Sequence, residues 1–312
     1  MDPDGDETPL AGRLRYGGDF TMSGPLVLAI PTYHCAHYLP HTLESLAAQG
    51  DAVRWWLQDG ASKDGTADIA RKYARPGDTV VSEKDRGQSD AINRAFARMG
   101  GEIVGFINGD DCLTPGAVAA VLEAFRRNPE IDLVYGEVEW IDAEGNKTGD
   151  HQGEISTLEE LLDLYSVWFR GRQWVQPEVF FRRSLWEKAG PFSLEYDLAF
   201  DYAYWVQCMM AGARVLRLER PLARFRLHEA QKSTNAAKAA AEMREIVRKA
   251  LALYPPISAK ARARVIAQIN YDDYQLAPSP KLSFAKALLR NPGWLRAPAV
   301  RGRLLDTFLR RT

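Results

Sequence analysis

Two adjacent carboxylates, Asp110 and Asp111, are the side chains in this 312-residue sequence with the clearest capacity for chemistry. The apolar run Gly101–Phe106 before them predicts a buried strand. Thr114 and the proline after it predict a helix start, with Thr114 as the N-cap. The pair therefore falls in a loop at the carboxyl end of a strand, where open α/β sheets bind ligands. Such carboxylates suit a hard divalent cation, whose other ligands are usually the phosphates of a substrate. Taken alone, they are also typical of a solvated acidic turn.

Further carboxylates follow the neighbouring predicted strands. Asp59 comes directly after one strand, and Asp85 and Asp90 follow the next. Because the carboxyl ends of parallel strands lie at one edge of a sheet, we expect these side chains near Asp110. Together they would suit the base and ribose hydroxyls of a nucleotide, with a metal on its phosphates. Single members have simpler interpretations, such as an Asx turn at Asp59 or a surface ion pair between Asp85 and Arg86.

The elements that must position these side chains alternate between strand and helix over the first 128 residues. Short apolar runs predict strands, and apolar residues at helical spacing predict helices. This rhythm predicts an α/β fold with a mostly parallel nucleotide-binding sheet flanked by helices. The predicted strands are Pro25–Ile30, Val53–Leu57, Thr79–Ser82 and Gly101–Phe106, and the predicted helices are His37–Gln49, Asp64–Tyr73 and Gln88–Met99.

The rhythm changes after Asn128, where strands become longer and helices fewer. Residues 24–233 are expected to form one domain, with a donor-nucleotide half over 24–128 and an acceptor half over 129–233. Residues 1–23 are expected to be a disordered segment, and residues 234–312 a helical basic extension. The predicted elements of the second half are strands at Ile131–Ile141, Val179–Arg182 and Arg214–Leu227, and helices at Thr157–Tyr165 and Phe200–Ala211.

The sequence motifs of several protein classes are absent from this sequence. Neither a Gly-x-Gly-x-x-Gly fingerprint, a P-loop nor a His-Glu-x-x-His motif occurs. Three widely spaced cysteines argue against a disulfide framework or a thiolate zinc site, and they suit a reducing compartment. No apolar run approaches the roughly 20 residues that span a bilayer. The acidic N-terminus does not resemble a signal peptide. We therefore expect a cytoplasmic protein.

The net charge of −1 hides an asymmetry. Residues 234–312 carry 15 lysine and arginine residues against 5 aspartate and glutamate residues, whereas the rest of the chain is acidic. Apolar residues recur at helical spacing among these basic residues. This pattern predicts either peripheral contact with an anionic membrane surface or a helical cap packed on the main domain. Nucleic acid is not an expected partner, because aliphatic residues interrupt the basic ones and no binding motif is present.

Four stretches resemble family 2 glycosyltransferases of the GT-A fold in order, spacing and strand-end placement. The resemblance covers about residues 25–230 and includes acceptor-side motifs at 176–183, 190–192 and 201–202. Asn108 stands where many relatives carry another aspartate, and Phe200 stands where relatives often have glutamate. The four stretches are Pro31-Thr32-Tyr33, residues 58–66 (Gln58-Asp59-Gly60 to Thr66), residues 82–93 (Ser82 to Asn93) and Asn108-Gly109-Asp110-Asp111.

The resemblance implies roles for the matching residues on the donor side. Asp59 would accept a hydrogen bond from the base, Asp90 would help to hold the base or ribose, and Asp110 would face the ribose and sugar. UDP is the default nucleotide. The donor-nucleotide-binding residues that the resemblance implies are Pro31, Thr32, Tyr33, Asp59, Asp90 and Asp110.

The resemblance also implies a metal ligand and a general base. Asp111 would coordinate Mn²⁺ or Mg²⁺ on the donor diphosphate, where the cation stabilises the leaving anion. His228, which follows a predicted strand, is a second candidate ligand; a structural histidine is the alternative. Asp201, near a helix N-terminus, would take the proton of the acceptor hydroxyl. A helix-end charge that only favours the macrodipole is the alternative for Asp201.

The expected activity is that of an inverting, non-processive hexosyltransferase of polysaccharide biosynthesis. It would move one sugar from a nucleotide-diphosphate sugar to a hydroxyl of a glycan or lipid-linked glycan acceptor. The absence of a Gln-x-x-Arg-Trp motif after Asp201 favours single addition. Two alternatives stay open. A nucleotidyltransferase that forms nucleotide sugars would need a Gly-rich N-terminal loop, which is missing, and a non-catalytic binding module would not need Asp201.

Overall fold

A computed structural model describes residues 24–229, 231–232, 235–254, 257–276 and 284–309 of the chain. The predicted disordered segment 1–23 lies outside the described residues. Strands of the described part form one sheet in the order β3-β2-β1-β4-β8-β6-β9-β5, with β7 paired to β6. The strands are β1 (Leu26–Thr32), β2 (Val53–Asp59), β3 (Thr79–Ser82), β4 (Ile103–Phe106), β5 (Cys112–Leu113), β6 (Leu133–Ile141), β7 (Lys147–Gln152), β8 (Val179–Arg182) and β9 (Val215–Arg226).

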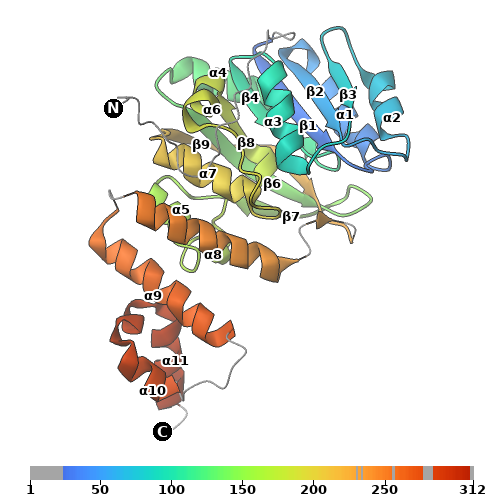
Figure 1. Ribbon diagram of the computed structural model, residues 1–312. Coiled ribbons are helices and arrows are strands. Elements are labelled where there is room, and N and C mark those ends of the chain that lie inside the picture. The colour runs from blue at the N-terminus through green and yellow to red at the C-terminus, as the bar shows by residue number, and fades with distance from the viewer. Residues whose placement is uncertain (1–23, 230, 233–234, 255–256, 277–283, 310–312) are drawn as a thin grey trace, which may run out of the picture.

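Helices flank the sheet, and further helices follow it at the C-terminal end (Figure 1). Over the sheet they are α1 (Leu39–Ala47), α2 (Thr66–Tyr73), α3 (Gln88–Arg98), α4 (Ala117–Arg127), α5 (Leu158–Leu162), α6 (Arg183–Ala189) and α7 (Phe200–Met210). The later helices are α8 (Ala236–Leu253), α9 (Ala259–Leu276), α10 (Phe284–Arg290) and α11 (Pro298–Leu309), with a 3₁₀ helix, η5 (Pro292–Arg296), before α11.

The predicted α/β architecture is confirmed. Strands β3, β2, β1 and β4 pair in parallel within residues 24–128, as the strand–helix alternation predicts. After residue 128, β8 pairs antiparallel with both β4 and β6, so the complete sheet is mixed. A helical C-terminal extension is also present, as predicted.

Strand β1 separates two apolar layers. Its side chains alternate, so Val27 and Ala29 pack with α3, α5, α6 and α7, whereas Leu28 and Ile30 pack with α1, α2 and α4. Every residue of β1 is buried, because a parallel strand with helices on both faces leaves neither face to solvent. The two layers hold the strand ends, and therefore the loops that follow them, at a fixed edge.

The helix after the Asp110–Asp111 turn begins later than the sequence predicts. It starts at Ala117, and Gly116, in the left-handed conformation with φ 73°, is its N-cap. Thr114 is therefore not the cap. Its hydroxyl donates instead to the carbonyl of Pro221 at 2.7 Å and ties this loop to β9. A tertiary hydrogen bond thus replaces the local one that the sequence favours.

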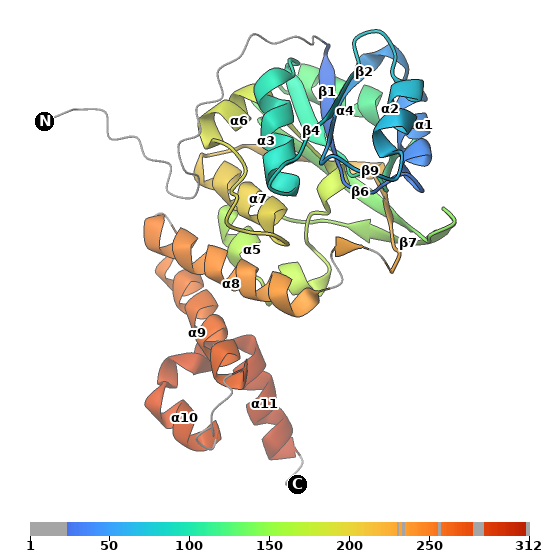
Figure 2. The ribbon, with the colours of Figure 1, turned by 45° about the vertical axis from the view of Figure 1, so that its right-hand side comes forward.

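The C-terminal helices divide into two parts. Helix α8 and the first half of α9 contribute to the same core as α7. Helix α10, η5 and α11 pack against the second half of α9 in a smaller cluster centred on Trp294. Figures 1 and 2 show α9 to α11 projecting away from the sheet. Among the described helices, none combines the length and apolarity needed to cross a membrane.

Candidate active site

The ends of β1, β2 and β3 bring three polar side chains into one row. The strand register places Thr32 opposite Asp59 and Asp59 opposite Ser82. The Asp59 carboxylate is fully buried and accepts hydrogen bonds from the Ser82 hydroxyl at 2.6 Å and from the Ser62 amide at 2.9 Å. Thr32 Oγ1 lies 3.4 Å from Asp59 Oδ1. Asp59 therefore organises the loop after β2 as well as facing the strand-end edge.

Beside this row, Asp85 and Tyr33 closely approach the backbone of Gly60. A Cβ atom built on Gly60 would lie 3.0 Å from Asp85 Oδ2 and 3.2 Å from Tyr33 Cδ2. Tyr33 follows β1 directly, is 67% exposed, and stacks on His34 with ring centroids 4.3 Å apart. His34 and Ala61 both have left-handed φ values, of 54° and 63°. Non-glycine residues in this region cluster at functional sites.

Asp90 lies in the first turn of α3 and is engaged within the chain. Arg86 donates to it at 3.0 Å, and Arg94 pairs with it at 2.8 Å. Burial raises the pKa of Asp90, but hydrogen bonds from Arg86 and the charges of Arg94 and Arg86 outweigh burial and hold the pKa below its usual value. Asp90 is thus an ionised anchor for the turn between β3 and α3.

The Asp110–Asp111 turn follows β4, as predicted, but its two carboxylates differ in environment. Asp111 is buried; its Oδ1 accepts from the Arg226 amide at 3.0 Å, and its Oδ2 lies 3.3 Å from Asn108 Nδ2. Gln88 holds Asn108 in turn, at 2.7 Å. Burial, followed by the charge of Asp110, raises the pKa of Asp111 well above its usual value. A cation at this place would offset both effects.

Arg226, at the end of β9, is a site residue that the sequence analysis missed. Its side chain is fully buried and donates to the carbonyl oxygens of Asp110 at 2.9 Å, Asp142 at 3.1 Å and Ala143 at 2.9 Å. Its guanidinium also lies 5.0 Å from the centre of the Tyr38 ring. Its place two residues before His228, within the predicted strand, was the available signal.

His228, two residues after the end of β9, contacts the acidic turn. Its Nε2 lies 3.0 Å from Asp110 Oδ2, and its ring packs against Tyr38 with centroids 4.6 Å apart. Carboxylate and imidazole groups of the kind that Asp110, Asp111 and His228 carry bind divalent metals such as Mn²⁺. Among the described residues, no group of three or more His, Cys, Asp or Glu side chains is arranged to hold a metal ion. Diphosphate and water oxygens would have to complete the coordination.

Asp201 lies in the first turn of α7, as predicted. Its Oδ1 accepts from the Tyr202 amide at 2.7 Å. Burial raises the pKa of Asp201 to about 6, although backbone hydrogen bonds and the charge of Lys232 lower it. A carboxylate with such a pKa is ionised at neutral pH and more basic than a solvated one. It is therefore suited to accept a proton from a hydroxyl group.

An aromatic contact places the start of α7 beside the end of β4. The ring of Phe200 lies 6.1 Å from that of Phe106, the last residue of β4 before the acidic turn. The segment after β9 connects the same two regions, because His228 contacts Asp110 and Lys232 lies 5.9 Å from the Phe200 ring. Asp201 and the Asp110–Asp111 turn thus belong to neighbouring parts of one edge of the molecule.

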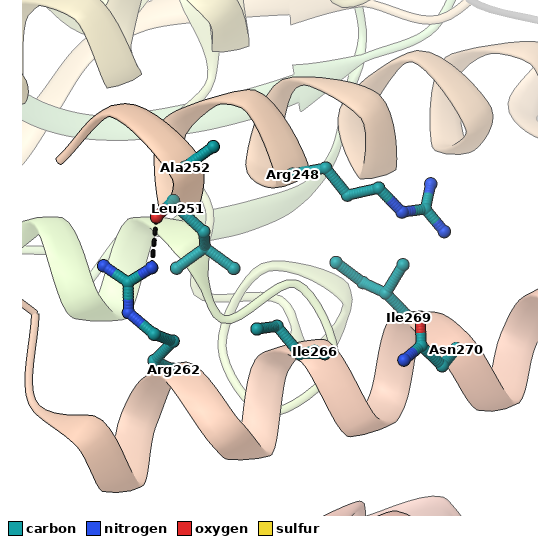
Figure 3. Close-up of a pocket in the computed structure, with 7 residues that line it drawn as sticks. All are labelled: Arg248, Leu251, Ala252, Arg262, Ile266, Ile269 and Asn270. Atoms are coloured by element: carbon teal, nitrogen blue, oxygen red, sulfur yellow. Dashed lines mark hydrogen bonds between the residues drawn. The ribbon is translucent and has the colours of Figure 1, made fainter. Parts of the chain in front are cut away.

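A separate pocket of about 290 Å³ lies between α8 and α9 (Figure 3). Leu251, Ile266 and Ile269 provide its apolar wall. The arginines at its rim are both engaged, Arg262 with the Leu251 carbonyl and Arg248 with Asp273. None of the strand-end carboxylates lines this pocket, so it is distinct from the candidate active site.

The fold is that of the GT-A glycosyltransferases. Residues 27–189 match the sequence model of the family described as "Glycosyl transferase family 2". The chain belongs to this family. A "PGL/p-HBAD biosynthesis glycosyltransferase" of Mycobacterium bovis is 32% identical over 203 residues, covering 63% of this chain and 74% of the relative. Chondroitin synthase of Escherichia coli is 33% identical over 126 residues, covering 39% of this chain and 18% of that one.

Solved structures agree on the fold. Residues 1–349 of S. aureus TarS in complex with UDP-GlcNAc superpose with a TM-score of 0.61 at 17% identity, covering 86% of this chain and 78% of that one. A longer TarS chain is covered over 44% of its length. The mannosyltransferase PcManGT of Pyrobaculum calidifontis, in complex with GDP-Man and Mn²⁺, gives a TM-score of 0.57 at 18% identity, covering 90% and 83% of the two chains.

Proposed function

We propose that this glycosyltransferase moves one sugar from a UDP-sugar to a hydroxyl of a glycan or lipid-linked glycan, with inversion and without processive addition. The observation that carries the proposal is Asp201, a carboxyl group with a pKa raised to about 6 in the first turn of α7. As the acceptor oxygen attacks the anomeric carbon, its proton would pass to Asp201. The bond from that carbon to the diphosphate breaks, and the nucleoside diphosphate leaves with the electron pair.

We propose that the row at the ends of β1 and β2 binds the nucleotide. Tyr33 offers an exposed ring face on which a base can stack. Asp59, next to it, would accept a hydrogen bond from the base, and Pro31 and Thr32 form the buried floor beneath. Asp90 would contribute by fixing the turn that borders the ribose, since its own carboxylate is paired with two arginines.

We propose that Asp111 and His228, with Asp110 beside them, hold a divalent cation together with the donor diphosphate. Bound there, the cation would stabilise the negative charge of the departing diphosphate. Asp110 is the more exposed of the two carboxylates and would also face the ribose and sugar. The likeness in fold to a mannosyltransferase solved with GDP-Man and Mn²⁺ favours Mn²⁺ for the first trials.

A donor screen tests this proposal directly. The thermal stability of the full chain would be measured with UDP, GDP and dTDP, each with and without Mn²⁺. Hydrolysis of UDP-glucose, UDP-galactose, UDP-GlcNAc and GDP-mannose would follow, with water in place of the acceptor. We expect metal-dependent stabilisation by one diphosphate and slow hydrolysis of one matching donor. Absence of stabilisation by every diphosphate would overturn the proposal, and stabilisation without any turnover would favour the non-catalytic binding module.

A nucleotidyltransferase predicts a different product in the same experiment. It would release pyrophosphate from a nucleoside triphosphate and a sugar 1-phosphate, and it would not hydrolyse a nucleotide sugar. Measuring pyrophosphate release with UTP and glucose 1-phosphate therefore separates the two reactions. We expect none.

We propose that the protein is cytoplasmic and that its C-terminal extension contacts an anionic membrane surface. Leu289 in α10 and Leu295 in η5 are 82% and 47% exposed and stand next to Arg290 and Arg296. Apolar side chains flanked by cations suit the interface of an anionic bilayer. All three cysteines are unpaired, as expected for a reducing compartment. Such a location would bring the site to a lipid-linked acceptor.

Co-pelleting with vesicles tests the membrane contact. Removing the whole extension would also remove Ile246 and Val247 of α8 from the core, so substitution is the better design. We expect full-length protein to pellet with vesicles containing phosphatidylglycerol and less so with neutral phosphatidylcholine. A Leu289→Ser, Leu295→Ser variant should stay in the supernatant. Equal pelleting of the variant and the native protein would discard this contact.

A further inference from the structure

The loop before Asp201 is held by charged side chains of the C-terminal extension. Figure 1 shows α8 running alongside α7. Asp197 pairs with Lys238 at the start of α8 and with Lys232 just before it, each at 2.6 Å. Lys249, near the end of α8, pairs with Glu195 at 2.6 Å. The loop at 195–199 is thus fixed at both ends from a part of the chain outside the sheet domain.

Glu242 of α8 contacts the residues directly before α7, the helix that carries Asp201. One of its carboxylate oxygens, Oε2, accepts from the amides of Leu198 and Ala199, both at 2.8 Å. Ala199 is the N-cap of α7, and an alanine side chain cannot cap a helix. A carboxylate at a helix N-terminus also interacts favourably with the helix dipole. Glu242 therefore satisfies the N-cap amide and the amide before it, as the glutamate of a capping box does for the N-cap amide.

The position of Glu242 is itself well defined. Its side chain is largely buried, and Lys238, one turn earlier, lies 3.8 Å from its Oε1. Asn235 is the N-cap of α8, and its side chain accepts a hydrogen bond from the Lys238 amide at 3.1 Å. Met243, the residue after Glu242, is buried in the core shared with α7. The carboxylate is therefore presented by a rigid helix rather than by a mobile tail.

We propose that Glu242 is a positioning residue for Asp201, so that the C-terminal extension takes part in catalysis without touching the donor. The inference rests on the proposed role of Asp201 as the general base. Asp201 lies only two residues after the Ala199 amide that Glu242 holds. Loss of the contact would let the first turn of α7 fray, and the base would move away from the acceptor oxygen. A displacement of about 1 Å at a reacting group can cost a hundredfold in rate.

Alanine and glutamine substitutions at Glu242 test the inference. In hydrolysis of the donor that the screen identifies, we expect Glu242→Ala to lower kcat by about tenfold to a hundredfold, with the donor KM within about twofold. Glu242→Gln keeps an acceptor oxygen for both amides and should recover most of kcat. Glu245→Ala is the matched control, because Glu245 lies on the same helix and pairs only with Lys249 among the described contacts.

Hydrogen–deuterium exchange provides a second readout that does not depend on turnover. The amides of residues 198–204 should exchange faster in Glu242→Ala than in the native protein or in Glu245→Ala. Unchanged exchange, an unchanged kcat, or a glutamine variant no better than alanine would each overturn the inference. If Glu242→Ala does not fold, Glu242→Asp, whose side chain is one methylene shorter and withdraws the carboxylate from both amides, replaces it in this comparison.

The inference and the proposed function fail in different ways. If Asp201→Asn keeps native hydrolysis, the general base is wrong, whatever Glu242 does. If Asp201→Asn is inactive while Glu242→Ala behaves like the native protein in kcat and in exchange, only the positioning role is wrong.

Discussion

The imidazole Nε2 of His228 lies 3.0 Å from the carboxylate Oδ2 of Asp110, although 118 residues separate the two along the chain. Asp110 follows strand β4 in the first part of the chain, whereas His228 follows β9, the last strand of the sheet in the sequence. Arg226, two residues before His228, binds both the Asp110 carbonyl and the Asp111 carboxylate. The acidic turn is therefore shaped by the far end of the sheet as much as by its own sequence.

Tyr33 should matter for nucleotide binding and hardly at all for stability. Its ring is 67% exposed and stacks only on His34 among the described rings. Because stacking on a base contributes about 1–3 kcal/mol, Tyr33→Ala should weaken UDP binding by about tenfold or more. Calorimetric titration measures the affinity, and Tyr33→Phe, which keeps the ring, is the control. Native affinity in the alanine variant would remove Tyr33 from the donor site.

Gly60 should tolerate no side chain without loss of nucleotide affinity. A methyl group there would meet Asp85 at 3.0 Å and Tyr33 at 3.2 Å. We expect Gly60→Ala to push the Tyr33 ring aside and to weaken UDP binding by about tenfold. Gly149→Ala is the control, because a Cβ atom at Gly149 meets only Trp140, at 3.4 Å. Equal affinities for UDP in the two variants would show that the close approach at Gly60 does not matter for nucleotide binding.

Arg226→Met should both destabilise the protein and weaken metal-dependent donor binding. The substitution leaves the carbonyl oxygens of Asp110 and Ala143 without their donor, at a cost of about 2–4 kcal/mol, whereas the Asp142 carbonyl keeps the Gly145 amide. Arg224→Met is the matched control on the same strand, because Arg224 makes a partly exposed ion pair with Glu139, worth about 0–1 kcal/mol. Urea unfolding measures the stability of the two variants. The expectation fails if the two variants lose equal stability.

The rate of donor hydrolysis should fall on the acid side of neutrality. Asp201 must be ionised to accept a proton, and its pKa is raised to about 6 by burial despite the nearby charge of Lys232. At saturating donor, kcat should therefore drop about tenfold for each pH unit below 6. Asp201→Asn should bind UDP normally and lose activity at all pH values. If the residual kcat of this variant still falls below pH 6, a group other than Asp201 causes that fall.

Asp201→Asn should also be more stable than the native protein at neutral pH. The folded-state pKa of Asp201 is raised from 3.8 to about 6, so above pH 6 the native fold holds a buried charge that the unfolded chain solvates better. The neutral amide should gain about 1–3 kcal/mol at pH 7.5. This gain should shrink as the pH falls from 6 through 3.8, because well below 3.8 the carboxyl is protonated in both states. Thermal unfolding at pH 7.5 and pH 4 measures the difference, and a gain that persists at pH 4 would argue against this cause.

Local patterns were sufficient for the architecture and for the place of the main carboxylates. Thr79–Ser82 and Val179–Arg182 are strands with the predicted bounds, and Asp201 lies in the first turn of a helix that begins at Phe200, as predicted. Strand periodicity, helix spacing and turn residues are encoded within a few positions of the chain. Parallel strands then necessarily align their carboxyl ends, which is why Asp59 and Asp110 could be assigned to one edge.

Only the tertiary structure decided which groups hold those carboxylates. Thr114 was predicted to cap a helix, but it bonds Pro221 of β9 instead. Arg226 was not recognised as the support of the Asp110–Asp111 turn, and Glu242 was not recognised as the partner of the Leu198 and Ala199 amides before α7. Each of these contacts joins residues more than 40 positions apart. Sequence determines local conformation through short-range sterics and hydrogen bonding, whereas these partners meet only after the sheet and its C-terminal helices have packed.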